Sequence, residues 1–177
     1  ADDIFVAKLN TSTGVYVWAN HYGGSSGDGA GGAAIDSAGN IFLTGTFVNS
    51  VNFGTGALTS SFGSADIFIA KYNSSGTPLW SNRFGAGAND FANGIAVDSV
   101  GNVVLVGSYQ GTFNFGGAAL TRTPVGADGM FIAKLDSAGG HLWSKGFTLG
   151  GTSNHANGVA IDSAGNVLVT GYVAGAI

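Results

Sequence analysis

One five-residue sequence, Asp-Ser-x-Gly-Asn, occurs three times and is the first place to look for a metal site. It occupies residues 36–40, 98–102 and 162–166. A calcium loop of the EF-hand type needs oxygen ligands at alternate positions and a terminal bidentate glutamate, because calcium takes about six to eight oxygens. Each copy supplies one aspartate and one serine, and the chain contains no glutamate. The sequence therefore predicts no metal ligand in these three copies.

The same five residues are well suited to a tight turn between two strands. The aspartate can accept hydrogen bonds from the backbone N–H groups that follow it, as in an Asx-turn. The glycine can adopt the positive φ of a type I turn with a bulge, and asparagine tolerates that region or restarts the strand. The predicted turn residues are Asp36, Gly39, Asn40, Asp98, Gly101, Asn102, Asp162, Gly165 and Asn166.

Three glycine-rich loops contain the best candidates for ligand binding. Asp28 lies in GGSSGDGAGG, Asp90 lies in GAGANDFANG, and Asn154 takes the equivalent position in TLGGTSNHANG. Loops on a rigid scaffold often carry binding residues, so these side chains could contact a sugar hydroxyl or a weakly held calcium ion. The alternative is that each side chain only hydrogen-bonds to the backbone of its own loop. The sequence leaves both alternatives open.

The other polar residues do not predict an active site. Aspartates recur at fixed positions, whereas a catalytic carboxylate pair is a single asymmetric arrangement. His21, His141 and His155 occupy unrelated positions and lack the spacing of zinc ligands. The chain also lacks a Gly-x-Ser-x-Gly elbow and a P-loop lysine. We therefore expect no catalytic residue, no metal ligand and no cofactor, with calcium as the one alternative.

Three tryptophans, Trp18, Trp80 and Trp143, follow one another at intervals of 62 and 63 residues. They could form a stacking platform for a sugar or a cofactor, as the repeated tryptophan of some quinone-dependent propeller enzymes would suggest. A large aromatic side chain at a fixed position is also well suited to wedge between neighbouring sheets. We assign all three to the structural core.

These residues belong to a unit that recurs about every 62 residues. The sequence DIFVAKLN at 3–10 returns as DIFIAKYN at 66–73 and as MFIAKLD at 130–136. Self-similarity at this period is typical of propellers and solenoids. We divide the single repeat domain, 1–177, into about 2.8 repeats at residues 3–65, 66–127 and 128–177.

Each unit reads as four antiparallel strands. In the second unit these are DIFIAKY, LWSNRFG, GIAVD and VVLVGSY, and residues 110–127 are expected to add one or two short strands. Four such strands bury both faces only against neighbouring sheets, and radial stacking of the sheets gives a β-propeller. The predicted fold is all-β, with β-propeller-type repeats of four-stranded antiparallel sheets. A linear stack, or solenoid, of the same sheets is the alternative.

Composition favours this fold and excludes several kinds of partner. The chain has 32 glycines and a charged fraction of 9%, and the usual helix formers are scarce. A net charge of −4 without any basic run gives no footprint for nucleic-acid binding. No stretch is long and apolar enough to span a membrane. The absence of cysteine excludes disulfides and thiolate metal sites.

The repeat also resembles a known family. The stretch GNVVLVGSYQGTFNFGGAALTRTPVGADGMFIAKLDSAGGHLWSKGF resembles the SBBP-type β-propeller repeats of large secreted bacterial proteins. Those repeats follow D-x-F-V-x-K-L-D-x-x-G, a tryptophan strand, a G-G loop and I-A-V-D-x-x-G-N-V-Y-x-T-G. The resemblance covers essentially the whole chain in three registers. It implies a propeller-like fold in a secreted or surface protein, and it implies no general catalytic role.

The expected function is that of a non-catalytic scaffold, located outside the cell or on its surface. Fewer than three whole units cannot close a propeller, which usually needs about four to eight blades. We therefore expect the chain to be part of a larger propeller or to associate with further copies of itself. One alternative is a carbohydrate- or calcium-binding module that uses the 28/90/154 loops and recognises a glycan. The second alternative is a fragment of a propeller enzyme.

Overall fold

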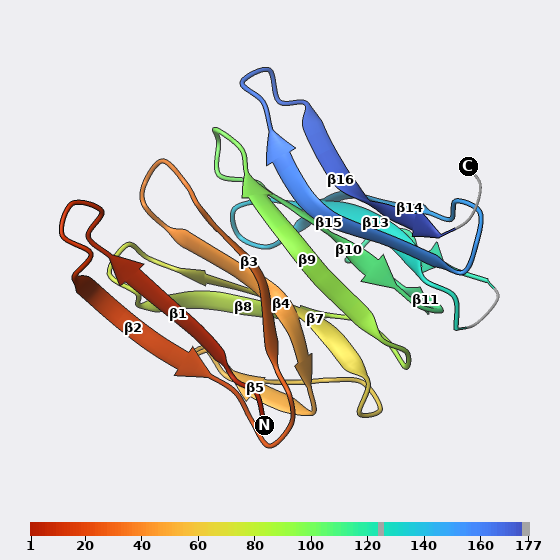
Figure 1. The fold of residues 1–177 in the computed structure, drawn as a ribbon, viewed down its shortest axis with the longest axis horizontal. Helices are drawn as coiled ribbons and strands as arrows, with labels where there is room; N and C mark the ends of the chain where they lie inside the picture. Colours follow the sequence, from red (N-terminus) through yellow and green to blue (C-terminus); the bar gives the residue numbers. More distant parts are fainter. Residues whose placement is uncertain (124–125, 175–177) are drawn as a thin grey trace.

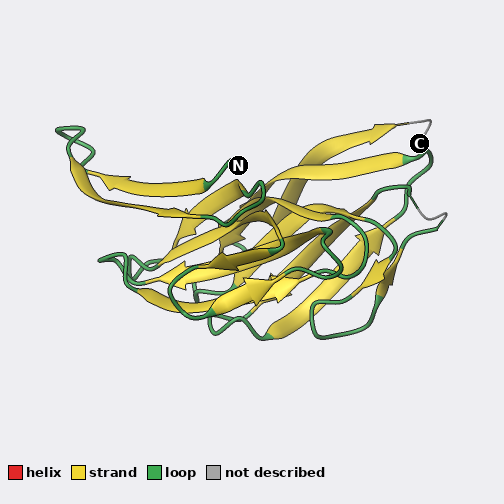
Figure 2. Ribbon diagram, turned by 90° about the horizontal axis from the view of Figure 1, so that it is seen from below, coloured by secondary structure: helices red, strands yellow, loops and turns green. Residues whose placement is uncertain are grey.

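The computed structural model describes residues 1–123 and 126–174, and in this part of the chain all regular structure is strand (Figures 1 and 2). The strands are β1 Ile4–Leu9, β2 Tyr16–Tyr22, β3 Gly29–Ile35, β4 Ile41–Val48, β5 Ser50–Asn52, β6 Ala57–Thr59, β7 Ala65–Tyr72, β8 Pro78–Phe84, β9 Asp90–Val97, β10 Val103–Tyr109, β11 Thr112–Phe113, β12 Leu120–Thr121, β13 Gly129–Leu135, β14 His141–Phe147, β15 Ser153–Ile161 and β16 Val167–Ala174. The described residues include no apolar helix of the length that crosses a bilayer.

Two four-stranded antiparallel sheets form the centre of the molecule, in the orders β3-β4-β7-β8 and β9-β10-β13-β14. A separate two-stranded sheet lies beyond each of them, β1-β2 at the N-terminal end and β15-β16 at the C-terminal end (Figure 1). The short pairs β5-β6 and β11-β12 occupy the two long connections. The prediction of an all-β repeat fold built from four-stranded antiparallel sheets is confirmed.

The division of the sheets corrects one expectation. We expected the four strands of each sequence unit to form one sheet, but every four-stranded sheet combines two consecutive units. Strands β3 and β4 end the first unit, and they pair with β7 and β8, which begin the second. The reason is local: β4 and β7 are joined through the short β5-β6 pair and align antiparallel over their whole length. Between β8 and β9 the chain instead crosses to the next sheet.

The alternation of side chains along β7 produces two separate cores. Phe68, Ala70 and Tyr72 face the β1-β2 sheet and pack in one cluster with Ile4 and Val6. The opposite face packs against the second four-stranded sheet: Ile67 and Ile69 share a cluster with Leu105, Phe131 and Ala133. Because a strand buries both faces only between two neighbouring sheets, β7 is buried along its entire length.

The third strands of the units lie side by side in the middle of the molecule, as β3, β9 and β15 (Figure 1). They approach so closely that small residues are required. A Cβ added to Gly31 in β3 would lie 2.0 Å from the carbonyl oxygen of Ala92 in β9. The Asn93 side-chain amide in turn donates to the carbonyl of Ala156 in β15, at 3.0 Å. Because the third strands contact one another, the sheets are arranged around a common line, as radial stacking requires.

The long connection between the second and third units contains β11 and β12, so the expected short strands are present. Residues 124–125 of this connection, and residues 175–177 at the end of the third unit, lie outside the described residues.

Candidate functional site: two open sheet edges

The three Asp-Ser-x-Gly-Asn copies form tight turns that use their own polar atoms. In the second copy, Asp98 Oδ1 accepts hydrogen bonds from the N–H groups of Val100 and Asn102, at 3.1 and 2.9 Å. Gly101 has a φ of +87°. The Asn102 side chain donates to Asp98 Oδ2 at 2.9 Å, a contact that the sequence had not suggested. The first and third copies repeat these bonds around Asp36 and Asp162.

Asp98 has a further partner, because Lys134 Nζ lies 2.8 Å from its Oδ2 atom. Burial alone would raise the pKa of Asp98, but the Lys134 ammonium and the N–H groups of the turn lower it to about 2. A carboxylate held in this way contributes stability above its unfolded pKa and loses that contribution as the pH falls toward 2. Its electrostatics therefore stabilise the turn.

We expect Asp98→Ala to lower the free energy of unfolding by about 1–3 kcal/mol at pH 7, because it leaves the turn N–H groups and Lys134 without their acceptor. Urea denaturation monitored by tryptophan fluorescence measures the change. Asp162→Ala is the matched control, since Asp162 occupies the same turn position and forms no salt bridge within residues 1–123 and 126–174. Equal losses in the two variants would contradict the role assigned to Lys134.

The loop residues Asp28 and Asp90 are almost fully buried, at 5% and 0% exposure. Asp28 accepts hydrogen bonds from the N–H groups of Gly24 and Val48, at 3.0 and 3.1 Å. Asp90 accepts equivalent bonds from Ala86 at 3.0 Å and from residue 110 at 3.3 Å. Both carboxylates therefore connect their loop to the end of the fourth strand of the unit, β4 or β10.

Asn154 takes the same place in the third unit and is also fully buried. Its side-chain amide donates to the carbonyl oxygens of Asp128 and Leu149, at 3.0 and 3.2 Å. Each of the three side chains therefore hydrogen-bonds within its own unit. Ligand binding at Asp28, Asp90 and Asn154 stays a hypothesis, and among the described residues no group of three or more acidic or histidine side chains could hold a metal ion.

Two polar clusters near the sheet ends were not found from the sequence. In one, Arg83 contacts both Asp66 and Ser61. In the other, His155 Nε2 lies 2.9 Å from both Asp128 Oδ2 and Ser153 Oγ. The aspartates recur in the repeat, but their partners differ from unit to unit, so periodicity could not reveal them.

The cluster around His155 does not have the geometry of a hydrolase triad. A triad histidine bonds the carboxylate through one ring nitrogen and the hydroxyl through the other. Here the carboxylate and the hydroxyl share Nε2, while the imidazole stacks on Tyr172 with centroids 4.8 Å apart. This arrangement holds the start of β15 in place. It does not let one ring nitrogen take the Ser153 proton while the carboxylate holds the other nitrogen.

Trp18 and Trp80 each cover a turn of the following unit. A Cβ added to Gly76 would lie 2.9 Å from the Trp18 ring, and one added to Gly139 would lie 3.2 Å from the Trp80 ring. Both indoles also pack against the hydrophobic clusters. Trp143 is different: it is 36% exposed, and no later turn covers it in the described residues.

The outermost strands each have one open edge. In the described residues β1 pairs with β2 alone and β16 pairs with β15 alone. The exposure of one repeat position shows what is missing at the N-terminal end. Phe68 and Phe131 are fully buried, whereas the equivalent Phe5 in β1 is 76% exposed. The half-sheet β1-β2 therefore lacks a covering layer on this face.

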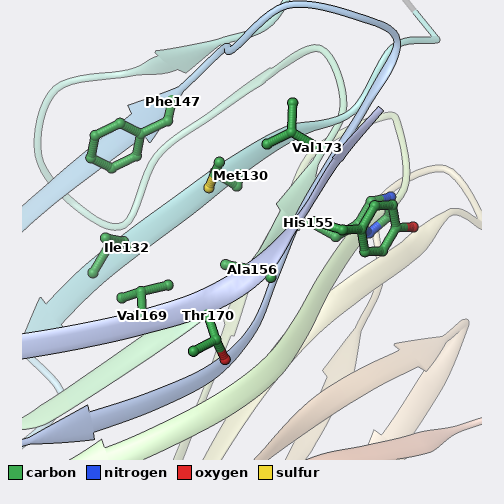
Figure 3. Close-up of a pocket in the computed structure, with 10 residues that line it drawn as sticks. Met130, Ile132, Phe147, His155, Ala156, Val169, Thr170 and Val173 are labelled. Carbon is green, nitrogen blue, oxygen red and sulfur yellow. The ribbon is translucent and has the colours of Figure 1, made fainter. Parts of the chain in front are cut away.

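The N-terminal half-sheet exposes an apolar side chain, whereas the C-terminal half-sheet borders an apolar pocket. A pocket of about 280 Å³ lies between β16 and the β13-β14 face, and it is largely apolar. Figure 3 shows Met130, Ile132 and Phe147 on one side and Val169 and Val173 on the other. In the two complete cores a first strand, β7 or β13, lines the corresponding space, and no strand among the described residues does so here.

Comparison with known proteins agrees with this architecture. Residues 79–109, from β8 to the end of β10, match the family model described as "SBBP: Beta-propeller repeat". The chain is 28% identical over 152 residues to an uncharacterized WD repeat-containing protein of Acanthamoeba polyphaga mimivirus. That alignment covers 78% of this chain and 11% of the relative, so the chain spans about a tenth of the length of the protein that it matches. Residues 79–109 are therefore similar to an SBBP-type β-propeller repeat, and the strands that they contain recur in the other units of this chain.

Proposed function

We propose that the chain is a non-catalytic interaction scaffold that associates with further copies of its own repeat through the open edges of β1 and β16. The single observation that supports the proposal is that the β1-β2 and β15-β16 sheets each have two strands, whereas the central sheets have four. Unpaired strand edges next to apolar surface favour pairing with another chain. The side chains Phe5 and Leu9 on the β1 edge are 76% and 46% exposed.

The polar residues support a scaffold better than an enzyme. The buried carboxylates Asp28 and Asp90 hydrogen-bond to the backbone of their own loops. The His155 cluster lacks the geometry for proton relay. We also propose that the protein acts outside the cell or on its surface, in keeping with its resemblance to repeats of secreted proteins and its low charged fraction of 9%.

We expect the chain to sediment as an associated species and Phe5→Asp to weaken that association by roughly tenfold or more, because a charge would be buried at the contact. Analytical ultracentrifugation over a range of concentrations measures the change. Phe62→Asp is the matched control, since Phe62 is 97% exposed and lies in a turn away from both open edges. A wild-type chain that stays a single copy at high concentration would refute the scaffold proposal.

A further inference from the structure

We propose that the β1-β2 hairpin of a second copy completes the sheet begun by β15 and β16, in a register that the chain already specifies. This inference rests on the proposed function and names the partner surface. In both whole sheets the order is third strand, fourth strand, then the first and second strands of the next unit. The β15-β16 sheet holds a third and a fourth strand, and the β1-β2 sheet holds a first and a second. The two half-sheets are therefore complementary halves of one sheet.

The register follows from two observed ladders. Leu43 lies opposite Ala70 in the β4-β7 pair, and Leu105 lies opposite Ala133 in the β10-β13 pair. The equivalent residues on the open edges are Val169 in β16 and Ala7 in β1. Antiparallel pairing in the same register places Val169 opposite Ala7 of the second copy.

A glycine and a phenylalanine support the same register. Gly45 lies opposite Phe68, and Gly107 lies opposite Phe131. The Phe131 ring sits so close to Gly107 that an added Cβ would lie 2.9 Å from it. The third glycine of this series is Gly171, and its opposite residue in the second copy is the exposed Phe5.

The pocket beside β16 corresponds to the core between the two whole sheets, but only one side of it is lined by a four-stranded sheet. Its lining residues Met130, Ile132 and Phe147 are equivalent to Ile67, Ile69 and Phe84, which pack in the complete core between the two whole sheets. In that core the opposite wall comes from the next first strand and includes Phe131, Ala133 and Leu135. The residues of β1 at these positions are Phe5, Ala7 and Leu9. An apolar hollow on one end thus matches exposed apolar side chains on the other.

One lysine contact recurs at both complete junctions, and its counterpart at the C-terminal end has no equivalent acceptor in the described residues. Lys8 Nζ donates to the carbonyl of Ser74 and Lys71 Nζ donates to that of Ser137, each at 2.9 Å. Lys134 has no later turn within the described residues and bonds Asp98 instead. In the proposed pairing its equivalent acceptor is the carbonyl of Thr11 in the second copy.

The same turn gives Trp143 a covering partner. Trp18 and Trp80 lie over Gly76 and Gly139 in the turn of the next unit. The equivalent glycine in the first unit is Gly14, which has a φ of +69° and nothing within 4 Å of an added Cβ. The proposed pairing places the exposed indole of Trp143 over Gly14 of the second copy.

The proposed contact is head-to-tail, because the C-terminal half-sheet of one copy meets the N-terminal half-sheet of the next. Such contacts give a ring where the rotation closes and a filament where it does not. Both assemblies use the same junction between β16 and β1.

Disulfide cross-linking tests the register, because the chain has no cysteine of its own. Ala7→Cys and Val169→Cys chains are mixed under a mild oxidant, and covalent dimer is measured on a non-reducing gel. We expect roughly tenfold more dimer than from Ala7→Cys mixed with Leu168→Cys, since the side chain one residue away points to the opposite face. Leu168 is 67% exposed, so its lower yield would not reflect poor access.

A single chain carrying Leu105→Cys and Ala133→Cys calibrates the yield, because these residues are opposite each other in the observed ladder. If the chains associate in the ultracentrifuge but the 7/169 mixture gives no more dimer than the 7/168 mixture, the register is wrong and the scaffold function stands. If the chains do not associate at all, the proposed function fails as well. A single chain that carries both Ala7→Cys and Val169→Cys can be linked at both ends. A ladder of covalent oligomers from this chain supports the pairing and indicates a filament rather than a ring.

Discussion

Replacing Phe131 with alanine is expected to lower the free energy of unfolding by about 3–5 kcal/mol, the range for truncating a large buried aromatic side chain. Phe131 is fully buried in the core between the two whole sheets. Its ring lies 5.0 Å from that of Phe115 and 6.1 Å from that of Phe113, measured between centroids. Neighbouring backbone on both sides leaves little room for the cavity to collapse. Urea denaturation gives the change.

The repeat supplies a matched control for this experiment. Phe5 occupies the same position in the first unit but is 76% exposed. At a protein concentration where the chain sediments as a single copy, Phe5→Ala should change the unfolding free energy by no more than about 0.5 kcal/mol. Similar losses of unfolding free energy in the two variants would mean that Phe5 is already covered within one chain. The interpretation of β1 as an open edge would then be wrong.

The second large effect concerns Asp90 and pH. Burial raises the pKa of Asp90 to about 7, against the opposing effect of the hydrogen bonds from Ala86 and residue 110. The ordinary value for the unfolded chain is 3.8. Between these values the folded state binds more protons than the unfolded state, so stability falls as the pH rises from about 4 to 7. A shift of this size corresponds to roughly 3–4 kcal/mol over that window.

Asp90→Asn should remove this slope and make the protein more stable than the wild type above pH 7. The buried Asn154 shows that an amide fits at the equivalent position of the third unit, where it donates to two backbone carbonyls. At position 90 the partners are two backbone N–H groups, so the amide oxygen keeps one of them, as a neutral carboxyl would. Urea midpoints measured from pH 4 to pH 8 for the two proteins give the result. A wild-type curve that rises through this window, or a variant with the same slope, would show that Asp90 is ionised in the folded state at neutral pH.

Asp36→Asn is the control with the opposite sign. Burial would raise the pKa of Asp36, but hydrogen bonds from Asn40 and Ala38 hold it below its ordinary value. A lowered pKa contributes stability above the unfolded pKa and loses it as the pH falls. The same chemical change at position 36 should therefore reduce stability at pH 7, whereas at position 90 it should increase it.

Much of the fold could be predicted from the sequence because the same strand and turn patterns occur in each of the three units. The sequence DIFIAKY predicted a strand that neighbouring sheets cover on both faces, and the structure has that strand. The turn at residues 98–102 could be derived from the known chemistry of aspartate and glycine. Both signals are local and need no knowledge of the neighbours in space.

Which strands of consecutive units share one sheet could not be predicted in the same way. A repeat of four strands has no marked beginning, so periodicity alone does not tell whether β8 is followed by a partner or by a crossover. The polar partners of Asp66 and Asp128 were missed for a related reason. Arg83 and His155 come from different positions of their units, and only the folded chain brings them to the aspartates.

Each whole sheet combines the last two strands of one unit with the first two strands of the next, and this offset affects how the number of repeats in a gene can change. Since each whole sheet joins the end of one unit to the start of the next, duplication of one complete unit adds one complete sheet wherever the breakpoint falls. The strands on either side of the added unit still pair as before. A lineage can therefore gain or lose blades by recombination without disturbing the neighbouring sheets.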